Sequence, residues 1–507
     1  MNDQNNNKNL NRRSFLKTLA VGTTAASTAS LASASAKTTW NIKTDVVIVG
    51  SGAAGISAAI ESARAGLEVL VLEMFQRAGG SSSMSGGVCY LGGGTPLQKA
   101  MGFTDTVEDM YNYIVNAGAL HPQLDKIQLY CEQSIEHFHW MVDNGIHYNE
   151  KFTDAKGLPY DDSSLYYSGS ELTYKSQQFS RPAPRGHVPG AMGMTGGRTT
   201  MEVLTASAEK LGVKIALNVS GQELVQNSDG SIAGLVVDWQ GESKRIQARK
   251  GVVLAAGGFI HNREMTRLHA PELHNCTVPW GNAGDQGMGI QMGMSVGGVG
   301  LRMNQGFAII PLYQPESVLK GIVVNQHGQR FISEDNYHAM MGHEITYNQH
   351  GKGWLITDEN SSYQHDDHRI KVQAESDSIA ELEQLIELPE GTLQQTVDYY
   401  NRHAEKQQDP LFHKSKDLLT PLNKPPFKAW NISVDTAFFP AHTFGGLHTN
   451  VDSQAINAGG EPIPGLYAAG RTSAGLPTAP YIASGISIGD CTFFGRRAGK
   501  HIARTTS

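Results

Sequence analysis

The sequence predicts an α/β fold in which a parallel-sheet domain is interrupted by a smaller α+β segment. An unbroken run of β-branched residues over 45–49 leads into a glycine-rich turn and a helical pattern. Apolar strands that end in small residues return at 250–259 and 465–470. Such runs are typical of parallel strands buried on both faces. Between the last two, the composition over 301–438 shifts toward histidine, charge and proline, which predicts an inserted segment.

The first 36 residues are predicted to be an export signal. Arg12-Arg13 precedes a mild apolar stretch over 18–31, and Ala34-Ser35-Ala36 supplies small residues for cleavage before Lys37. Paired arginines ahead of a weak apolar segment resemble a bacterial twin-arginine (Tat) signal. We therefore expect the protein to be exported to the periplasm or beyond. No apolar run in the mature chain is long enough to cross a bilayer.

A nucleotide-binding motif follows the first strand. Gly50-Ser51-Gly52-Ala53-Ala54-Gly55 lies between strand and helix, and a second apolar strand ends on Glu73. Gly50 allows the tight turn, Gly52 lets the backbone approach a pyrophosphate, and Gly55 lets helix and strand pack closely. The helix N-terminus favours phosphates, and Glu73 can accept hydrogen bonds from the ribose hydroxyls. These features predict a Rossmann-like dinucleotide site.

A second loop of small residues, just past Glu73, favours FAD over NAD, because the longer body of a flavin needs more backbone contact. Strand ends and tight turns later in the chain are expected to complete the site, since ligands of doubly wound sheets bind at the strand ends. The second loop supplies the candidate contacts Gly79, Gly80, Ser81, Ser82, Ser85, Gly86 and Gly87. The later candidates are Ala256, Gly257, Asp285, His442, Gly446, Gly470, Ser487 and Ile488.

Composition excludes several other classes of protein. The chain has 507 residues, enough for two or three domains, and a net charge of −7, which argues against nucleic acid as a partner. Its four cysteines are scattered, with no spacing for haem, an iron–sulfur cluster or zinc. The histidines form no pair at metal spacing backed by a carboxylate, so no metal is expected. Residues 152–197, rich in Tyr, Ser, Gly and Pro, predict irregular loops.

Five segments together resemble the fumarate reductase/3-ketosteroid dehydrogenase superfamily of FAD enzymes. They are Val49-Gly50-Ser51-Gly52-Ala53-Ala54-Gly55, Ala255-Ala256-Gly257-Gly258, Gly328-Gln329-Arg330-Phe331, Gly445-Gly446 and Pro464-Gly465-Leu466-Tyr467-Ala468-Ala469-Gly470. The resemblance covers nearly all of the mature chain. It implies a glutathione-reductase-type FAD-binding domain with an inserted cap. It also implies an oxidation or reduction at a CH–CH bond beside an electron-withdrawing group. The flavin ring would lie at the cap interface.

On this basis we expect a Tat signal over 1–36 and a cap domain over 301–438. The FAD-binding domain would consist of 37–300 and 439–507.

The resemblance also bears on the substrate. Fumarate reductases of the superfamily clamp two carboxylates with arginines and histidines. Where the family places the proton-donating arginine, eight residues after the position matching Arg330, this chain has His338. At the second clamp it has Tyr481-Ile482. A doubly charged substrate would lose its main partners, so fumarate is disfavoured.

Phenols at these two places resemble the ketosteroid dehydrogenases instead. One tyrosine comes from the loop after the Arg-Phe motif, here Tyr337, and the other from just before the C-terminal helix, here Tyr481. The segment 334–338 most resembles the branch that acts at the steroid 4,5-bond, in which a serine assists. Tyr481 stands four residues before Gly485, a spacing closer to the 1,2-dehydrogenating branch. The position of the double bond is therefore left open.

The expected chemistry can be derived from these groups. Removing a hydride from the carbon β to a ketone requires loss of the α proton, and polarising the carbonyl acidifies that proton. We expect Tyr481 and the Gly485 amide to hold the carbonyl oxygen. Tyr337 would exchange the α proton, with Ser484 relaying or orienting it, and flavin N5 would exchange the β hydride.

We therefore expect an FAD oxidoreductase that acts on an activated C–C bond in an apolar, steroid-like ketone. The alternative is a periplasmic, fumarate-reductase-like enoate reductase for a small unsaturated acid. In either case an external electron carrier is required, because no second redox group is predicted. A flavin-binding electron-transfer module without a substrate is a third hypothesis, and the cap argues against it because a cap encloses a pocket.

Overall fold

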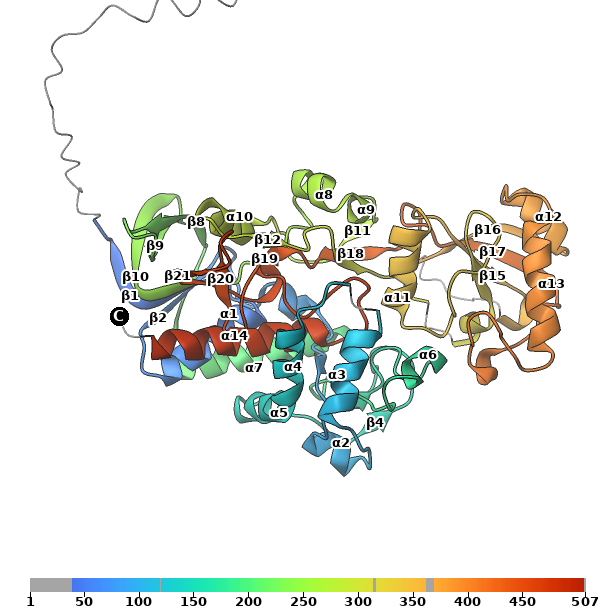
Figure 1. Cartoon of the computed structure of the whole chain (residues 1–507), viewed down its shortest axis with the longest axis horizontal. Coiled ribbons are helices and arrows are strands. Elements are labelled where there is room, and N and C mark those ends of the chain that lie inside the picture. The colour runs from blue at the N-terminus through green and yellow to red at the C-terminus, as the bar shows by residue number, and fades with distance from the viewer. Residues whose placement is uncertain (1–38, 119, 313–315, 362–368, 506–507) are drawn as a thin grey trace, which may run out of the picture. The chain divides into compact units, whose positions relative to one another are not determined.

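The structure, a computed structural model, describes residues 39–118, 120–312, 316–361 and 369–505 (Figure 1). The export signal expected over 1–36 lies outside these residues. Trp40–Ser507 forms one compact unit, and the domain boundaries expected within it remain predictions. In the described ranges, no helix combines the length and apolar character that a membrane span requires.

The largest sheet of the described chain has eight strands. β1 (Ile42–Val49) is parallel to β2 (Val69–Glu73) on one side and to β10 (Glu242–Leu254) on the other. β7 (Lys214–Leu217) continues the sheet beyond β2, and β21 (Pro462–Ala468) continues it beyond β10, both in parallel. The carboxyl ends of these strands meet along one edge, where open α/β sheets bind their ligands. The α/β fold expected from the sequence is present.

Antiparallel strands are added to this sheet at the β21 edge and alongside β10. β20 (Gln454–Ile456) pairs with β21, and β9 (Ile232–Trp239) pairs with β10. β8 (Val219–Gln226) forms a hairpin with β9.

The C-terminal helix packs against the helix of the nucleotide motif. α14 (Ile486–Arg504) lies alongside α1 (Ala53–Arg64) in Figure 1, next to the central sheet. A Cβ at Gly495 would lie 2.3 Å from the Ala54 carbonyl oxygen, so only glycine allows the two helices to approach this closely. The start of α14 is thereby held at the edge of the sheet where the ligand is expected.

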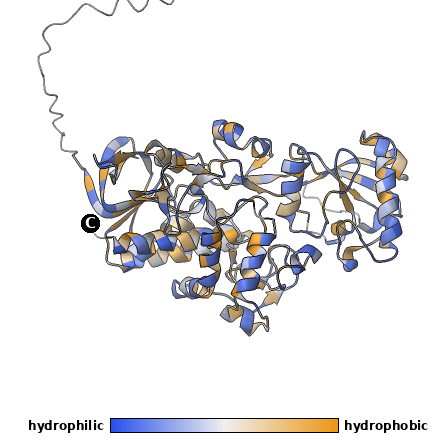
Figure 2. Cartoon of the chain, in the orientation of Figure 1, coloured by the Kyte–Doolittle hydropathy of each residue, from blue (hydrophilic) through white to orange (hydrophobic). Residues whose placement is uncertain are grey.

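A second, antiparallel sheet occupies the segment expected to be the cap. Its order is β14 (Ile322–Val324), β15 (Trp354–Thr357), β17 (Phe427–Asn431) and β16 (Lys371–Ser376). Two helices share its hydrophobic cluster, α12 (Ile379–Leu385) and α13 (Thr392–Ala404). Figure 2 shows α13 as mostly hydrophilic on the side turned to the viewer.

Two small sheets bring distant segments to the site. One has the order β11 (Val278–Pro279), β18 (Pro440–Thr443) and β13 (Gly306–Ala308). The other has the order β3 (Cys89–Tyr90), β6 (Gly186–His187), β5 (Leu165–Tyr166) and β4 (Phe152–Thr153). Three of the latter strands lie in the stretch from which irregular loops were expected, because two-residue strands leave no periodicity in the sequence.

The remaining elements connect these layers. β12 (Gly300–Leu301) pairs with β19 (Gly446–Leu447). The further α-helices are α2 (Pro96–Ala100), α3 (Val107–Asn116), α4 (Leu124–Glu132), α5 (Ser134–Asp143), α6 (Tyr174–Gln177), α7 (Gly196–Lys210), α8 (Arg263–His269), α9 (Pro271–His274), α10 (Met288–Ser295) and α11 (His338–His343).

Candidate active site

The glycine motif forms the floor of a cavity of about 210 Å³ at the carboxyl ends of β1 and β2. Gly50 has φ +104°, and a Cβ there would lie 2.3 Å from the Ala255 carbonyl oxygen. A Cβ at Gly55 would lie 2.0 Å from the Gly50 carbonyl oxygen. At Gly52, by contrast, the nearest atom to such a Cβ is 3.5 Å away, which leaves room for a ligand. As the motif predicts, Gly50 and Gly55 allow close backbone contacts, and Gly52 leaves room for a ligand.

Glu73 ends β2 at the wall of this cavity and is almost fully buried. One carboxylate oxygen accepts hydrogen bonds from the Ser51 amide, at 3.3 Å, and from the Ser51 hydroxyl. The other accepts the Phe75 amide at 3.0 Å. The acid is thus held in one position beside the motif, where a ribose would lie.

Most of the predicted cofactor contacts line this first cavity. Gly55, Gly79 and Gly446 line neither this cavity nor the one described next. Gly79 instead donates to the Ser51 carbonyl oxygen at 3.2 Å, and a Cβ at Gly446 would strike the Thr472–Ser473 backbone. The residues that do line the first cavity include Gly50, Gly52, Ala53, Ala54, Glu73, Gly80, Ser81, Ser82, Ala256, Gly257, Asp285 and Gly470.

Asp285 joins three segments around the first cavity. Its carboxylate accepts the Ser81 hydroxyl at 2.9 Å and the Gly258 amide at 3.2 Å. It also pairs with the Arg471 guanidinium at 2.5 Å. Sequence reasoning missed Arg471, although it directly follows the strand-end glycine Gly470, and a charged residue at that point is the signal that could have revealed it.

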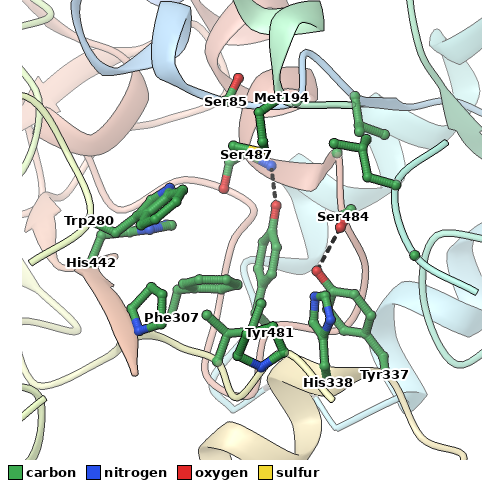
Figure 3. A pocket seen from close by; sticks show the side chains of 18 of the residues that line it. Ser85, Met194, Trp280, Phe307, Tyr337, His338, His442, Tyr481, Ser484 and Ser487 are labelled. Atoms are coloured by element: carbon green, nitrogen blue, oxygen red, sulfur yellow. Dashed lines mark hydrogen bonds between the residues drawn. The ribbon is translucent and has the colours of Figure 1, made fainter. Parts of the chain in front are cut away.

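A second cavity, of about 350 Å³, brings the four predicted catalytic residues together (Figure 3). The Tyr337 hydroxyl is hydrogen-bonded to the Ser484 hydroxyl at 2.7 Å. The centroids of the Tyr337 and Tyr481 rings are 6.3 Å apart. Gly485, which caps α14, also lines this cavity. The other predicted residues in its wall are Ser85, Gly86, Gly87, His442, Ser487 and Ile488.

The Tyr481 hydroxyl is held by the first turn of α14. It accepts a hydrogen bond from the Ser487 amide at 3.0 Å, as Figure 3 shows. Burial raises the pKa of Tyr481 to about 12, so the group is a neutral phenol at physiological pH. Because its oxygen accepts from the helix, its own proton is left to be donated to a ligand.

His442 lies in the aromatic wall of the same cavity. Its ring stacks on Phe307 with the centroids 4.6 Å apart. Burial lowers the pKa of His442 well below its usual range, so the imidazole is neutral. Sequence reasoning missed Phe307, which lies in the three-residue strand β13 without any motif.

The residues of both cavities fit FAD. Gly80–Ser82 line the first cavity and Ser85–Gly87 line the second, so one loop runs past both. In the second cavity, Nε2 of His442 and Oγ of Ser487 are buried without a hydrogen-bond partner among the described residues. FAD carries a pyrophosphate that the glycine motif of the first cavity could bind. Its polar ring system could give the buried atoms of His442 and Ser487 in the second cavity hydrogen-bond partners.

The two cavities, both lined by the loop 80–87, fit a bound FAD, and the family and relatives reported next show that the protein is an FAD-dependent oxidoreductase that acts on a CH–CH bond. The profile of one family, the FAD binding domain family, matches residues 45–488, and the chain belongs to it. The superfamily and the cofactor expected from the sequence are thus confirmed.

Individual relatives agree with this assignment. The chain is 30% identical over 498 residues to 3-oxo-5-alpha-steroid 4-dehydrogenase of Comamonas testosteroni, covering 85% of this chain and 93% of that protein. It is 28% identical over 486 residues to urocanate reductase of Eggerthella lenta, covering 90% and 74%. A crystal structure of 3-ketosteroid-delta4-(5alpha)-dehydrogenase from Rhodococcus jostii, in complex with 4-androstene-3,17-dione, matches with a TM-score of 0.87. That match has 38% identity and covers 93% of this chain and 99% of that chain.

Proposed function

We propose that the protein is a 3-ketosteroid dehydrogenase or reductase that acts at the 4,5-bond of its substrate. The observation that carries this proposal is the convergence of Tyr337 and Tyr481 on one aromatic cavity. Relatives whose names specify the steroid 4-position support it, at 30% and 38% identity.

Tyr481 would bind the ketone oxygen. A neutral phenol whose oxygen accepts the Ser487 amide is a stronger donor, because hydrogen bonds in a chain polarise one another. The N-terminus of α14 adds its positive end to the field on the developing enolate oxygen. The Gly485 amide is proposed as the second donor to the same oxygen.

Tyr337 would exchange the α proton. Its hydroxyl lies 2.7 Å from Ser484, so a proton taken up by the phenol oxygen can be passed on within one hydrogen bond. Bound FAD supplies the acceptor or donor of the hydride at the β carbon. The roles of these two residues rest on the site geometry and on the resemblance of their motifs to ketosteroid dehydrogenases.

The walls of the second cavity favour an apolar, flat substrate. Trp280, Phe307 and Phe438 line it together with Ile309 and Pro440. Its volume of about 350 Å³ lies in the range of small-molecule sites. Rings buried against such walls gain about 25 cal/mol per Å² of apolar area removed from water.

A small unsaturated acid is the second candidate substrate. Of the described residues that line the cavity, Lys156 and Arg369 are cationic and none is Asp or Glu. A carboxylate could approach these two cations. In both cases we propose an external electron carrier and, from the paired arginines near the N-terminus, export through the twin-arginine pathway.

Anaerobic mixing of the purified holoenzyme with substrates distinguishes the candidates. Bleaching of the flavin absorption by 5α-androstane-3,17-dione, with 4-androstene-3,17-dione as the product, supports the proposal. Reoxidation of the reduced enzyme by fumarate or urocanate, but not by 4-androstene-3,17-dione, refutes it in favour of the acid. A product desaturated at the 1,2-bond would refute the assigned position while retaining the substrate class.

A further inference from the structure

A cavity of about 470 Å³, which we call the Arg302 cavity, shares no lining residue with the proposed FAD and substrate cavities. It opens to solvent, because Leu120, His121 and Asn304 in its lining are exposed. Of the described residues that line it, Arg302, His121 and His343 are basic and none is Asp or Glu. The lining therefore favours an anion over a cation.

Arg302 directly follows β12 and is only 8% exposed. One terminal nitrogen of its guanidinium donates a hydrogen bond to the Gly475 carbonyl oxygen. Nε and the other terminal nitrogen are buried without a hydrogen-bond partner among the described residues. Most of the N–H donors of this cation thus lack an acceptor, although burying a charge is costly unless it is paired and hydrogen-bonded.

The charge of Arg302 is balanced only in part within the protein. Burial lowers the pKa of Arg302 to about 10, and the negative charge of Asp490 opposes this shift, so the guanidinium is charged at neutral pH. Burial raises the pKa of Asp490 to about 6, and both Lys126 and Arg302 oppose that rise. One carboxylate therefore faces two buried cations. A net positive charge is left beside the Arg302 cavity.

His343, the last residue of α11, contributes a second unpartnered donor. It lines the same cavity and is 7% exposed. Its ring stacks on Tyr347 with the centroids 4.7 Å apart, and its buried Nδ1 has no hydrogen-bond partner among the described residues. Burial lowers the pKa of His343 to about 4, so the imidazole is neutral at physiological pH. In the tautomer that is protonated at Nδ1, this atom can donate a hydrogen bond to an anion.

We propose that the Arg302 cavity binds a small oxyanion, a carboxylate or a phosphate, through the guanidinium of Arg302 and Nδ1 of His343. A planar guanidinium matches two oxygens of such a group. Water could accept hydrogen bonds from the same donors, but only an anion would also balance the buried positive charge. The unpartnered donors and the excess charge would thus be satisfied by one ligand.

The site adjoins the segment that carries Tyr481. Gln305 also lines the Arg302 cavity, and its side chain donates to the Leu120 carbonyl oxygen and accepts the Ala479 amide, both at 3.2 Å. Ala479 lies two residues before Tyr481. A bound anion would therefore link α11 to the segment after β12 at the place where Gln305 supports the Tyr481 segment. Because only the folded chain brings these segments together, the anion should stabilise the native state.

Calorimetric titration of the FAD-loaded enzyme with inorganic phosphate and, separately, with acetate tests the site at constant ionic strength. Arg302→Met removes the guanidinium, and His343→Phe removes Nδ1 while keeping a ring to stack on Tyr347. The matched control is Arg496→Met, because Arg496 is also buried with an unpartnered Nε but is paired with Glu136 and does not line the cavity. The thermal midpoint of each protein is measured with and without the anion.

The expected result is saturable binding of phosphate or acetate at one site in the wild type and in Arg496→Met. The anion that binds more tightly identifies the class of ligand. Its affinity should be at least about tenfold weaker in Arg302→Met and in His343→Phe, since each loses a hydrogen bond to a charged group. Near saturation, the anion should raise the thermal midpoint of the wild type by about 2 °C.

Three results would overturn the proposal. Without saturable binding of either anion, water alone fills the cavity. Wild-type affinity in Arg302→Met or in His343→Phe would place the anion elsewhere, and an equal loss in Arg496→Met would mean that the effect does not depend on position. If Arg302→Met does not fold, the titration of His343→Phe decides alone. Because these titrations contain no steroid, their outcome is independent of the proposed function.

Discussion

Tyr481→Phe is the substitution that separates binding of the carbonyl from packing of the ring. The phenyl ring keeps its contacts with Phe307 and Phe444, whose centroids lie 5.2 and 5.3 Å from that of Tyr481. The hydroxyl that accepts the Ser487 amide at 3.0 Å is lost. Losing a preorganised donor to a developing oxyanion costs about 2.7–4 kcal/mol, or about 10²–10³ in kcat. Leaving the amide at the helix start unpaired costs about 1–3 kcal/mol of stability.

Stopped-flow bleaching of the flavin by 5α-androstane-3,17-dione measures the loss of kcat in Tyr481→Phe. Chemical denaturation measures its loss of stability. Tyr467→Phe is the control, because the Tyr467 hydroxyl is bonded to His501 at 2.9 Å, outside both ligand cavities. It should lose about 1 kcal/mol of stability and no activity. An unchanged kcat in Tyr481→Phe, with the expected loss of stability, would refute the role given to this hydroxyl.

Three further substitutions test other parts of the structure. Gly50→Ala should release FAD on ultrafiltration because its Cβ meets a carbonyl oxygen at 2.3 Å, whereas Gly66→Ala, where φ is also positive (+82°) but the space is open, should retain it. Equal retention of FAD by both variants would contradict the close approach. Ser484→Ala should slow proton exchange by about 10²-fold without loss of FAD, because it removes the 2.7 Å hydrogen bond to Tyr337. A proton-exchange rate equal to that of the wild type would argue against this role. Burial raises the pKa of Asp490 from 3.8 to about 6, so the native state holds this proton more tightly than the unfolded chain. Stability should therefore fall by about 3 kcal/mol as pH rises from about 4 to 6, and Asp490→Asn should lack that fall in denaturation curves; an identical fall in both proteins would contradict it.

The nucleotide half of the site was predictable from the sequence because its requirements are local. Gly50, Gly52 and Gly55 act within one turn, and their spacing reports the backbone geometry directly. Glu73 was predictable as a ribose ligand because it ends the next strand. Gly446 was predicted as a cofactor contact but lines neither ligand cavity, because a glycine can equally be required for close packing of two chain segments.

The catalytic half could be predicted only through resemblance. Tyr337 and Tyr481 are far apart in sequence, and no periodicity places their rings 6.3 Å apart. Arg471 and Phe307 were missed because each acts through a contact between distant segments.

The packing of α14 along α1 also has a consequence for biosynthesis. The first helix of the nucleotide motif is synthesised early, but its neighbour is the last helix of the described chain, and that helix also carries the amide that holds Tyr481. The ribosome must therefore have delivered the chain as far as α14 before the flavin pocket can close. The cofactor can therefore be enclosed only after α14 has been synthesised, so FAD must bind late in biosynthesis.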